Sequence, residues 1–188
     1  MTTTSVVEEV QQLLQKRGFQ VDRQVRFDWL TNRAPTEVDV PLPSQLKYRL
    51  VTLHARLGGD WSALTAKRRQ HLRVDLQVDG STLIEIDEKH HFSSRRLTSL
   101  GFYDGIDHGL DLSQYHGLCS QYQDSADKYL RGREAVDFPF PGGLTAQRAY
   151  FDTTKDMLAA AHGYRLIRLP APDGELTGAA KLALRVLV

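Results

Sequence analysis

Two short runs of alternating apolar and polar residues, joined by a turn sequence, constrain the fold of this chain more than any other feature. Residues 72–78 carry an apolar side chain at every second position, and residues 84–87 repeat that pattern. A period of two is typical of β-strands, and the Asp79-Gly80 pair between the runs is typical of a tight turn. The sequence therefore predicts a β-hairpin whose second strand begins soon after Gly80.

The second predicted strand carries ionisable side chains on one of its faces. Glu85, Asp87 and Lys89 occur at every second position, so all three are expected to point to the same side of the sheet. Carboxylates that lie side by side repel each other, and a buried charge needs a partner. A divalent cation would resolve that cost, because Mg²⁺ and Mn²⁺ prefer carboxylate oxygens as ligands.

The length of the turn decides whether Asp75 joins that face. A two-residue loop would pair Asp75 with Ile84 and point its side chain away from Glu85. A three-residue loop over residues 78–80 would pair Asp75 with Leu83 and place it diagonal to Glu85. A shift of one residue exchanges the two faces of a strand. We favour the loop of odd length, because only that loop gathers the acids.

The order of these residues resembles the PD-(D/E)XK nuclease superfamily. Asp75 matches the first acid of that pattern, and residues 87–89, Asp-Glu-Lys, match the acid-x-Lys of the next strand. Residues 84–90 are similar to the branch of very-short-patch repair endonucleases and their small bacterial relatives. Residues 147–156 resemble the helix after the hairpin in that branch, and residues 163–169 resemble its closing strand.

The resemblance implies an α/β fold of restriction-endonuclease-like type, with a central mixed β-sheet flanked by helices on both faces. It also implies metal-dependent phosphodiester hydrolysis, with DNA favoured over RNA as the substrate. Asp75, Asp87 and Glu85 would bind Mg²⁺ or Mn²⁺, Lys89 would catalyse and His90 would assist. Two alternatives stay open: a catalytically weak or inactive nuclease-fold module that binds nucleic acid or a partner protein, and a structural domain with a charged sheet face.

Basic residues around the hairpin and on the following helix are the candidates for phosphate contacts. Arg148, Asp152 and Lys155 share one face of that helix, where a surface ion-pair ladder is the competing interpretation. The net charge of +1 gives no global nucleic-acid signal, so a local basic patch is required. The candidates are Lys67, Arg68, Arg69, Arg73, Arg95, Arg96, Arg148 and Lys155.

The chain length of 188 residues suits one domain with its own core, and a hydrophobic fraction of 41% is ordinary for a globular protein. Within a single nuclease-like domain we expect the core hairpin at residues 72–90 and an irregular insertion at residues 93–143. A closing helix, strand and helix are expected over residues 145–188. The insertion departs from compact relatives of the superfamily, in which much less chain separates the hairpin from the helix.

The single cysteine, Cys119, excludes an internal disulfide framework and a cysteine-based zinc site. No apolar run reaches membrane-spanning length and the N-terminus lacks a signal-peptide pattern, so a cytoplasmic location without membrane contact is expected. The expected partner is nucleic acid, and a homodimer or a larger defence or repair complex is the further expectation from the resemblance.

Overall fold

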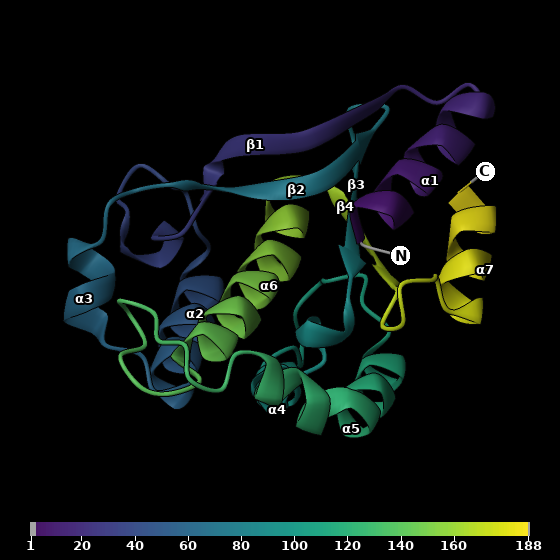
Figure 1. Ribbon diagram of the computed structural model, residues 1–188. Helices are drawn as coiled ribbons and strands as arrows, with labels where there is room; N and C mark the ends of the chain where they lie inside the picture. Colours follow the sequence, from purple (N-terminus) through teal and green to yellow (C-terminus); the bar gives the residue numbers. More distant parts are fainter. Residues whose placement is uncertain (1–2, 188) are drawn as a thin grey trace.

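A four-stranded mixed sheet forms the centre of the molecule in the computed structural model, which describes residues 3–187 (Figure 1). Its strand order is β1-β2-β3-β4. The first three strands form an antiparallel meander, and the fourth pairs in parallel with the third. The strands are β1 (Val21–Thr31), β2 (His71–Val78), β3 (Thr82–Asp87) and β4 (Arg165–Pro170). The α/β class with a mixed sheet is therefore as predicted.

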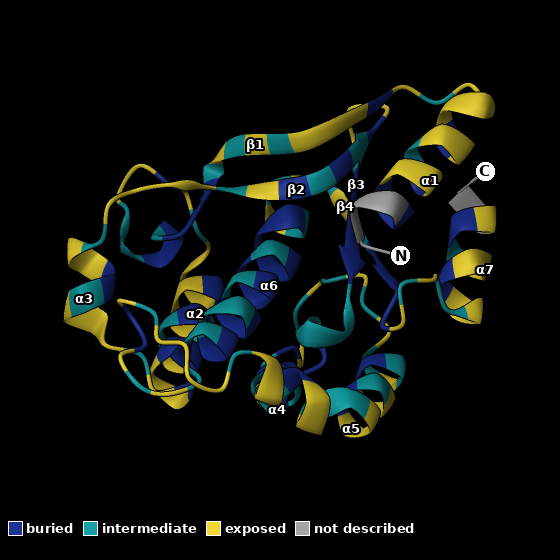
Figure 2. Ribbon diagram, viewed as in Figure 1, coloured by how far each residue is buried: buried dark blue, intermediate teal, exposed yellow. Residues whose placement is uncertain are grey.

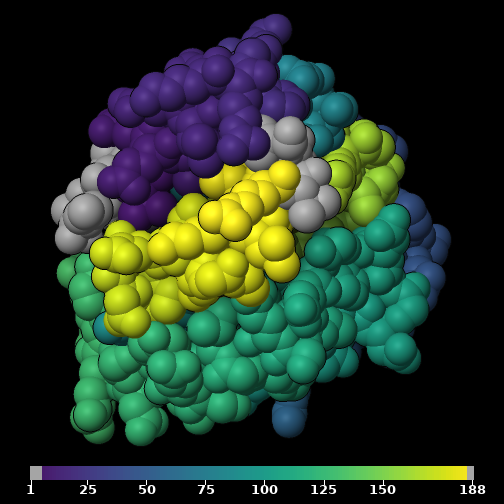
Figure 3. Space-filling view, turned by 90° about the vertical axis from the view of Figure 1, so that its right-hand side faces the viewer, coloured from purple at the N-terminus to yellow at the C-terminus, as the bar shows by residue number. Residues whose placement is uncertain are grey.

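Helices cover both faces of this sheet. Helices α1 and α7 lie on one face, whereas α6 packs on the other together with α2, α4 and α5 (Figure 1). In the space-filling view, α7 lies between the N-terminal segment and the surface formed around α5 (Figure 3). Across residues 3–187 the helices are α1 (Thr3–Lys16), α2 (Ser44–Arg56), α3 (Trp61–Ala66), α4 (Ser94–Leu100), α5 (Leu112–Tyr129), α6 (Gly143–Ala161) and α7 (Gly178–Leu187), with short 3-10 helices η1 (Ala34–Thr36) and η2 (Lys89–His91). Within that range, no helix combines the length and the apolar character needed to cross a membrane.

The alternation along β3 separates two apolar cores. One set of side chains packs with α1 and α7, and its members in the hairpin are Leu76, Val78, Ile84 and Ile86. Leu83 belongs to the second core, which surrounds α6. Glu85 and Asp87 alternate with the isoleucines and therefore face α6. Strand β3 is buried along most of its length (Figure 2). Within it, Glu85 and Asp87 are 3% and 1% exposed.

The turn of the hairpin has an odd number of residues, as predicted, but it lies one residue later than expected. Gln77 pairs with Leu83, so residues 79–81 form the loop. This pairing ends with Leu76 and Ile84, and the next residue, Asp75, contacts β3 through its side chain, whose Oδ2 accepts a hydrogen bond from the backbone N–H of Ile86. Asp75 therefore lies beside the strand that carries Glu85, and it does not pair with Leu83 as expected.

Residues 93–143 are not irregular throughout, because they contain α4 and α5. The Asp111 side chain accepts a hydrogen bond from the backbone N–H of Gln114, at 2.9 Å, and so caps the start of α5. Tyr115 and Cys119, one turn apart, then bury their side chains in the core around α6. This segment therefore covers the acidic face of β3 and helps to exclude water from it. The closing segment consists of α6, β4 and α7.

Gly143 allows α6 to begin close to the preceding loop. A Cβ atom at this position would lie 1.9 Å from the backbone oxygen of Phe138. We expect Gly143→Ala to lower the free energy of unfolding by about 1–3 kcal/mol, because backbone cannot yield as a side chain can. The matched control is Gly117→Ala in α5, where a Cβ meets no atom within 4 Å. That variant should gain up to about 1 kcal/mol, and equal stability of the two variants in urea unfolding would contradict the account.

Candidate functional site

Strands β2 and β3 and helix α6 bring two acids and a lysine together. Asp75 is half-buried, and its Oδ2 accepts a hydrogen bond from the backbone N–H of Ile86 at 2.9 Å. Oε2 of Glu85 lies 2.7 Å from Nζ of Lys155, which reaches across from α6. Oε1 of Glu85 is buried and has no hydrogen-bond partner among the residues that the structure describes. A bound cation would give this oxygen the partner that the described residues do not supply.

The environment of Glu85 changes its acidity. Burial raises the pKa of Glu85 from 4.5 to about 7, while Lys155 opposes that shift and Asp75 adds to it. The carboxyl group can therefore gain or lose its proton near neutral pH. A metal ion bound at Oε1 would take the place of that proton.

Asp87 belongs to a separate, fully buried network. Its Oδ1 accepts a hydrogen bond from Nη1 of Arg168 on β4 at 2.7 Å, and its Oδ2 accepts one from the Tyr115 hydroxyl at 2.5 Å. Nε of Arg168 also binds Oδ1 of Asp156 at 2.5 Å, and Arg96 binds the other oxygen of that carboxylate at 2.7 Å. The charge of Asp87 is thus compensated by Arg168. The expectation that a divalent cation must balance this acid is wrong.

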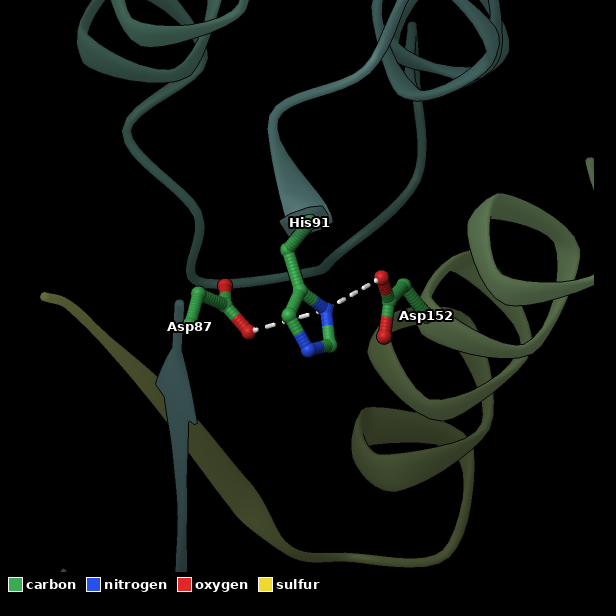
Figure 4. A group of neighbouring side chains, drawn as sticks. All are labelled: Asp87, His91 and Asp152. Atoms are coloured by element: carbon green, nitrogen blue, oxygen red, sulfur yellow. Dashed lines mark hydrogen bonds and ion pairs between the residues drawn. The ribbon is translucent and has the colours of Figure 1, made fainter. Parts of the chain in front are cut away.

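His91 lies between two carboxylates (Figure 4). Its Nδ1 is 2.8 Å from Oδ2 of Asp152 and 3.5 Å from Oδ1 of Asp87. Burial alone would lower the pKa of His91, but the two carboxylates outweigh burial and raise it. Burial likewise opposes ionisation of Asp152, yet His91 and Arg168 together hold the pKa of that carboxyl well below its ordinary value. The two neighbouring carboxylates therefore favour the charged form of the His91 ring.

The same three residues have the composition of a metal site. One potential ligand atom from each of Asp87, His91 and Asp152 lies within 4.8 Å of the others. However, the oxygens nearest to the ring already accept hydrogen bonds from His91 and Arg168. A cation would have to displace the proton of His91 and approach the Arg168 guanidinium. Binding of a cation by these three residues would therefore cost hydrogen bonds that the chain already makes.

An open depression of about 280 Å³ borders this group of residues. Its polar lining residues are Arg73, His91, Gln147, Arg148, Asp152 and Lys155, and its apolar ones are Leu72, Leu144 and Phe151. Nη1 of Arg148 is buried and makes no hydrogen bond to any part of the chain that the structure describes. The cationic lining suits an anionic group such as a phosphate.

Lys89 does not lie on the face predicted for it. Strand β3 ends two residues earlier, and Lys89 begins η2 with its Nζ 2.8 Å from Asp173. His90 also points away from the acids, with its Nδ1 2.9 Å from Glu88. The alternation that placed Lys89 beside Glu85 thus ends before it, and the lysine of the site is Lys155.

Three of the eight predicted phosphate contacts line the depression, namely Arg73, Arg148 and Lys155. Arg96 cannot contact a nucleic acid, because its side chain is buried against Asp156. Lys67 is largely buried and binds Asp137 at 2.8 Å. The other three, which are not among the lining residues, are Arg68, Arg69 and Arg95.

Sequence reasoning did not identify Arg168 and Tyr115 as partners of the acids. The signal for Arg168 was present, because a lone arginine interrupts the apolar residues Ile167 and Leu169 of a strand expected to be buried. Tyr115 gave no comparable signal, because the sequence around it shows no clear periodicity.

Comparisons with known protein families, with curated proteins and with solved structures found no match for this chain.

The raised pKa of Glu85 predicts a pH-dependent term in stability. The folded protein keeps this proton up to about pH 7, whereas unfolded glutamate loses it near pH 4.5. The free energy of unfolding should therefore fall between these values, by about 3 kcal/mol at 1.36 kcal/mol per pKa unit, and no further above pH 7. Glu85→Gln should remove this fall.

Urea unfolding of the parent and of Glu85→Gln from pH 4 to pH 8 isolates that term, because all other titrating groups are common to both proteins. A stability difference between the two that is independent of pH would show that Glu85 titrates at its ordinary value.

Proposed function

We propose that this protein is a metal-dependent phosphodiester hydrolase that cleaves nucleic acid, with DNA favoured over RNA. The observation that carries the proposal is the convergence of Asp75, Glu85 and Lys155 beside a depression with a cationic lining. Such a reaction requires acids that hold a cation, a lysine next to them and a binding site for phosphate.

The order of elements supports the proposal. The mixed sheet, and the parallel strand β4 that follows helix α6, are compatible with the restriction-endonuclease-like core that the resemblance implies. The segments that resemble the repair-endonuclease branch are β3 of the hairpin, helix α6 and strand β4. Helix α1 covers the opposite face of the sheet from α6.

Asp75 and Glu85 are the residues that would hold Mg²⁺ or Mn²⁺. Hard divalent cations take one or two protein carboxylates and complete their shell with water. Oε1 of Glu85, which has no hydrogen-bond partner among residues 3–187, fits that requirement. Such a cation would polarise the scissile phosphate and lower the pKa of an attacking water.

The neighbouring side chains have separate roles in this proposal. Lys155, which is 2.7 Å from Glu85, would stabilise negative charge on the phosphate in the transition state. Arg148 would bind a non-bridging phosphate oxygen through Nη1, which has no hydrogen-bond partner in the described part of the chain. His91 would donate a proton to the leaving oxygen, since Asp152 orients its ring and favours its charged form.

A nuclease-fold module without activity is the second candidate, and one observation favours it. The chain supplies its own positive charges to the buried acids, with Arg168 on Asp87 and Lys155 on Glu85. The negative charges of such a site are balanced without a metal ion. An inactive module would bind nucleic acid or a partner protein at the depression and leave phosphodiester bonds intact.

A cleavage assay on labelled duplex DNA, single-stranded DNA and RNA, with Mg²⁺, Mn²⁺ or EDTA, separates the two candidates. We expect metal-dependent cleavage, and we expect Lys155→Met to lower kcat by at least about 100-fold, because it removes a preorganised charge from the transition state. Lys89→Met is the matched control. Its kcat should stay close to that of the parent, because the Lys89 ammonium binds Asp173 away from the sheet face.

Thermal melts must first show that both lysine variants are folded. If the folded parent cleaves none of these substrates with either metal, the hydrolase proposal fails and the inactive module stands. If Lys89→Met loses as much activity as Lys155→Met, the assignment of Lys155 as the catalytic lysine fails.

A further inference from the structure

A second depression of about 460 Å³ lies next to η2, between the C-terminal half of α5 and residues 171–174. The neighbouring histidines of η2 face different depressions, since His91 lines the one described above and His90 lines this one. The volume is within the range of pockets that hold small organic groups. Two binding regions thus adjoin along one short segment of chain.

The second depression contains a stacked aromatic pair. The Tyr129 ring packs on the His90 ring with a centroid separation of 5.6 Å and an interplanar angle of 17°. Tyr129 is nevertheless 69% exposed. Burial lowers the pKa of His90 to about 3, so its ring is neutral at physiological pH. The pair therefore presents an exposed aromatic face to solvent, which is the chemistry on which a nucleobase stacks.

Arg148 connects this surface to the candidate phosphate site. Its side chain lines the first depression, yet both Glu88 and Tyr129 of the second depression lie near enough to its guanidinium to affect its charge. Burial lowers the pKa of Arg148, and these groups oppose that shift. The candidate phosphate site and the aromatic pair therefore adjoin along η2, where His91 lines one depression and His90 the other.

We propose that the His90–Tyr129 pair stacks an unpaired nucleobase, so that the preferred substrate is single-stranded nucleic acid. Bases inside a duplex already stack on each other and do not offer a free face to a protein ring. The inference rests on the proposed function only in taking the ligand to be nucleic acid. It adds the strandedness of the substrate and the residues that recognise it.

The test is a binding measurement without cleavage. Fluorescence anisotropy, in EDTA and at fixed salt, gives the Kd of the full chain for a labelled oligothymidylate and for a hairpin duplex with the same number of phosphates. Tyr129→Ala should weaken binding of the single strand about tenfold, in line with the loss of one stacked base, and should leave duplex binding unchanged. Tyr129→Phe should bind like the parent.

Tyr48→Ala is the matched control, because Tyr48 on α2 is 70% exposed and lines neither depression. An effect of Tyr129→Ala that is equal for single strand and duplex would overturn the inference. So would no effect of Tyr129→Ala, or no binding of the single strand by the parent. Because no metal is present, this assay is independent of catalysis. Tyr129-dependent binding without cleavage would refute the hydrolase proposal and support this inference. Cleavage with no strand preference would support the hydrolase proposal and refute this inference.

Discussion

The buried guanidinium of Arg168 is the interaction on which the rest of the structure depends. It contacts Asp87 at 2.7 Å, Asp156 at 2.5 Å and Asp152 at 3.5 Å, and its own side chain is 1% exposed. These contacts join β4 directly to β3 and to α6. Removal of one partner from a buried ion pair typically costs about 3–5 kcal/mol, because the remaining charge is left uncompensated. The position of α6 against the sheet is therefore held by charge as well as by apolar packing.

That position of α6 determines where the chemically useful side chains lie. Asp152 and Asp156 are four residues apart, so both face Arg168 from the same side of the helix. Lys155 lies on the adjoining strip of the helix and reaches Glu85, while Arg148 lines the depression. The sealed ion network and the open cationic depression thus share one helix. The ion network holds α6 in place and thereby sets the geometry of the depression. This is how Lys155 stays close to the Glu85 carboxylate.

Much of this arrangement could be predicted from the hairpin alone. The alternation of apolar residues predicted two strands, and the acids required a loop of odd length, because a shift of one residue would have separated Asp75 from Glu85. Lys89 was assigned wrongly because alternation does not show where a strand ends. The role of Lys155 beside Glu85 could not be inferred, since 70 residues separate them in the chain and only the docking of α6 joins them. The helices of residues 93–143 were largely missed for a local reason, since the glycines and aromatic residues in that segment obscure its helical period.

The central claim is that Glu85, with Asp75, binds a divalent cation in the folded protein. Calorimetric titration with Mn²⁺ above pH 7, where Glu85 is ionised, tests it without any substrate. Glu88→Gln serves as the control, because it removes a nearby acid whose side chain is 34% exposed and bound to His90. The account predicts one Mn²⁺ site in the parent and in Glu88→Gln, and loss of that site in Glu85→Gln. Failure of the parent to bind Mn²⁺, or equal binding by Glu85→Gln, would contradict it.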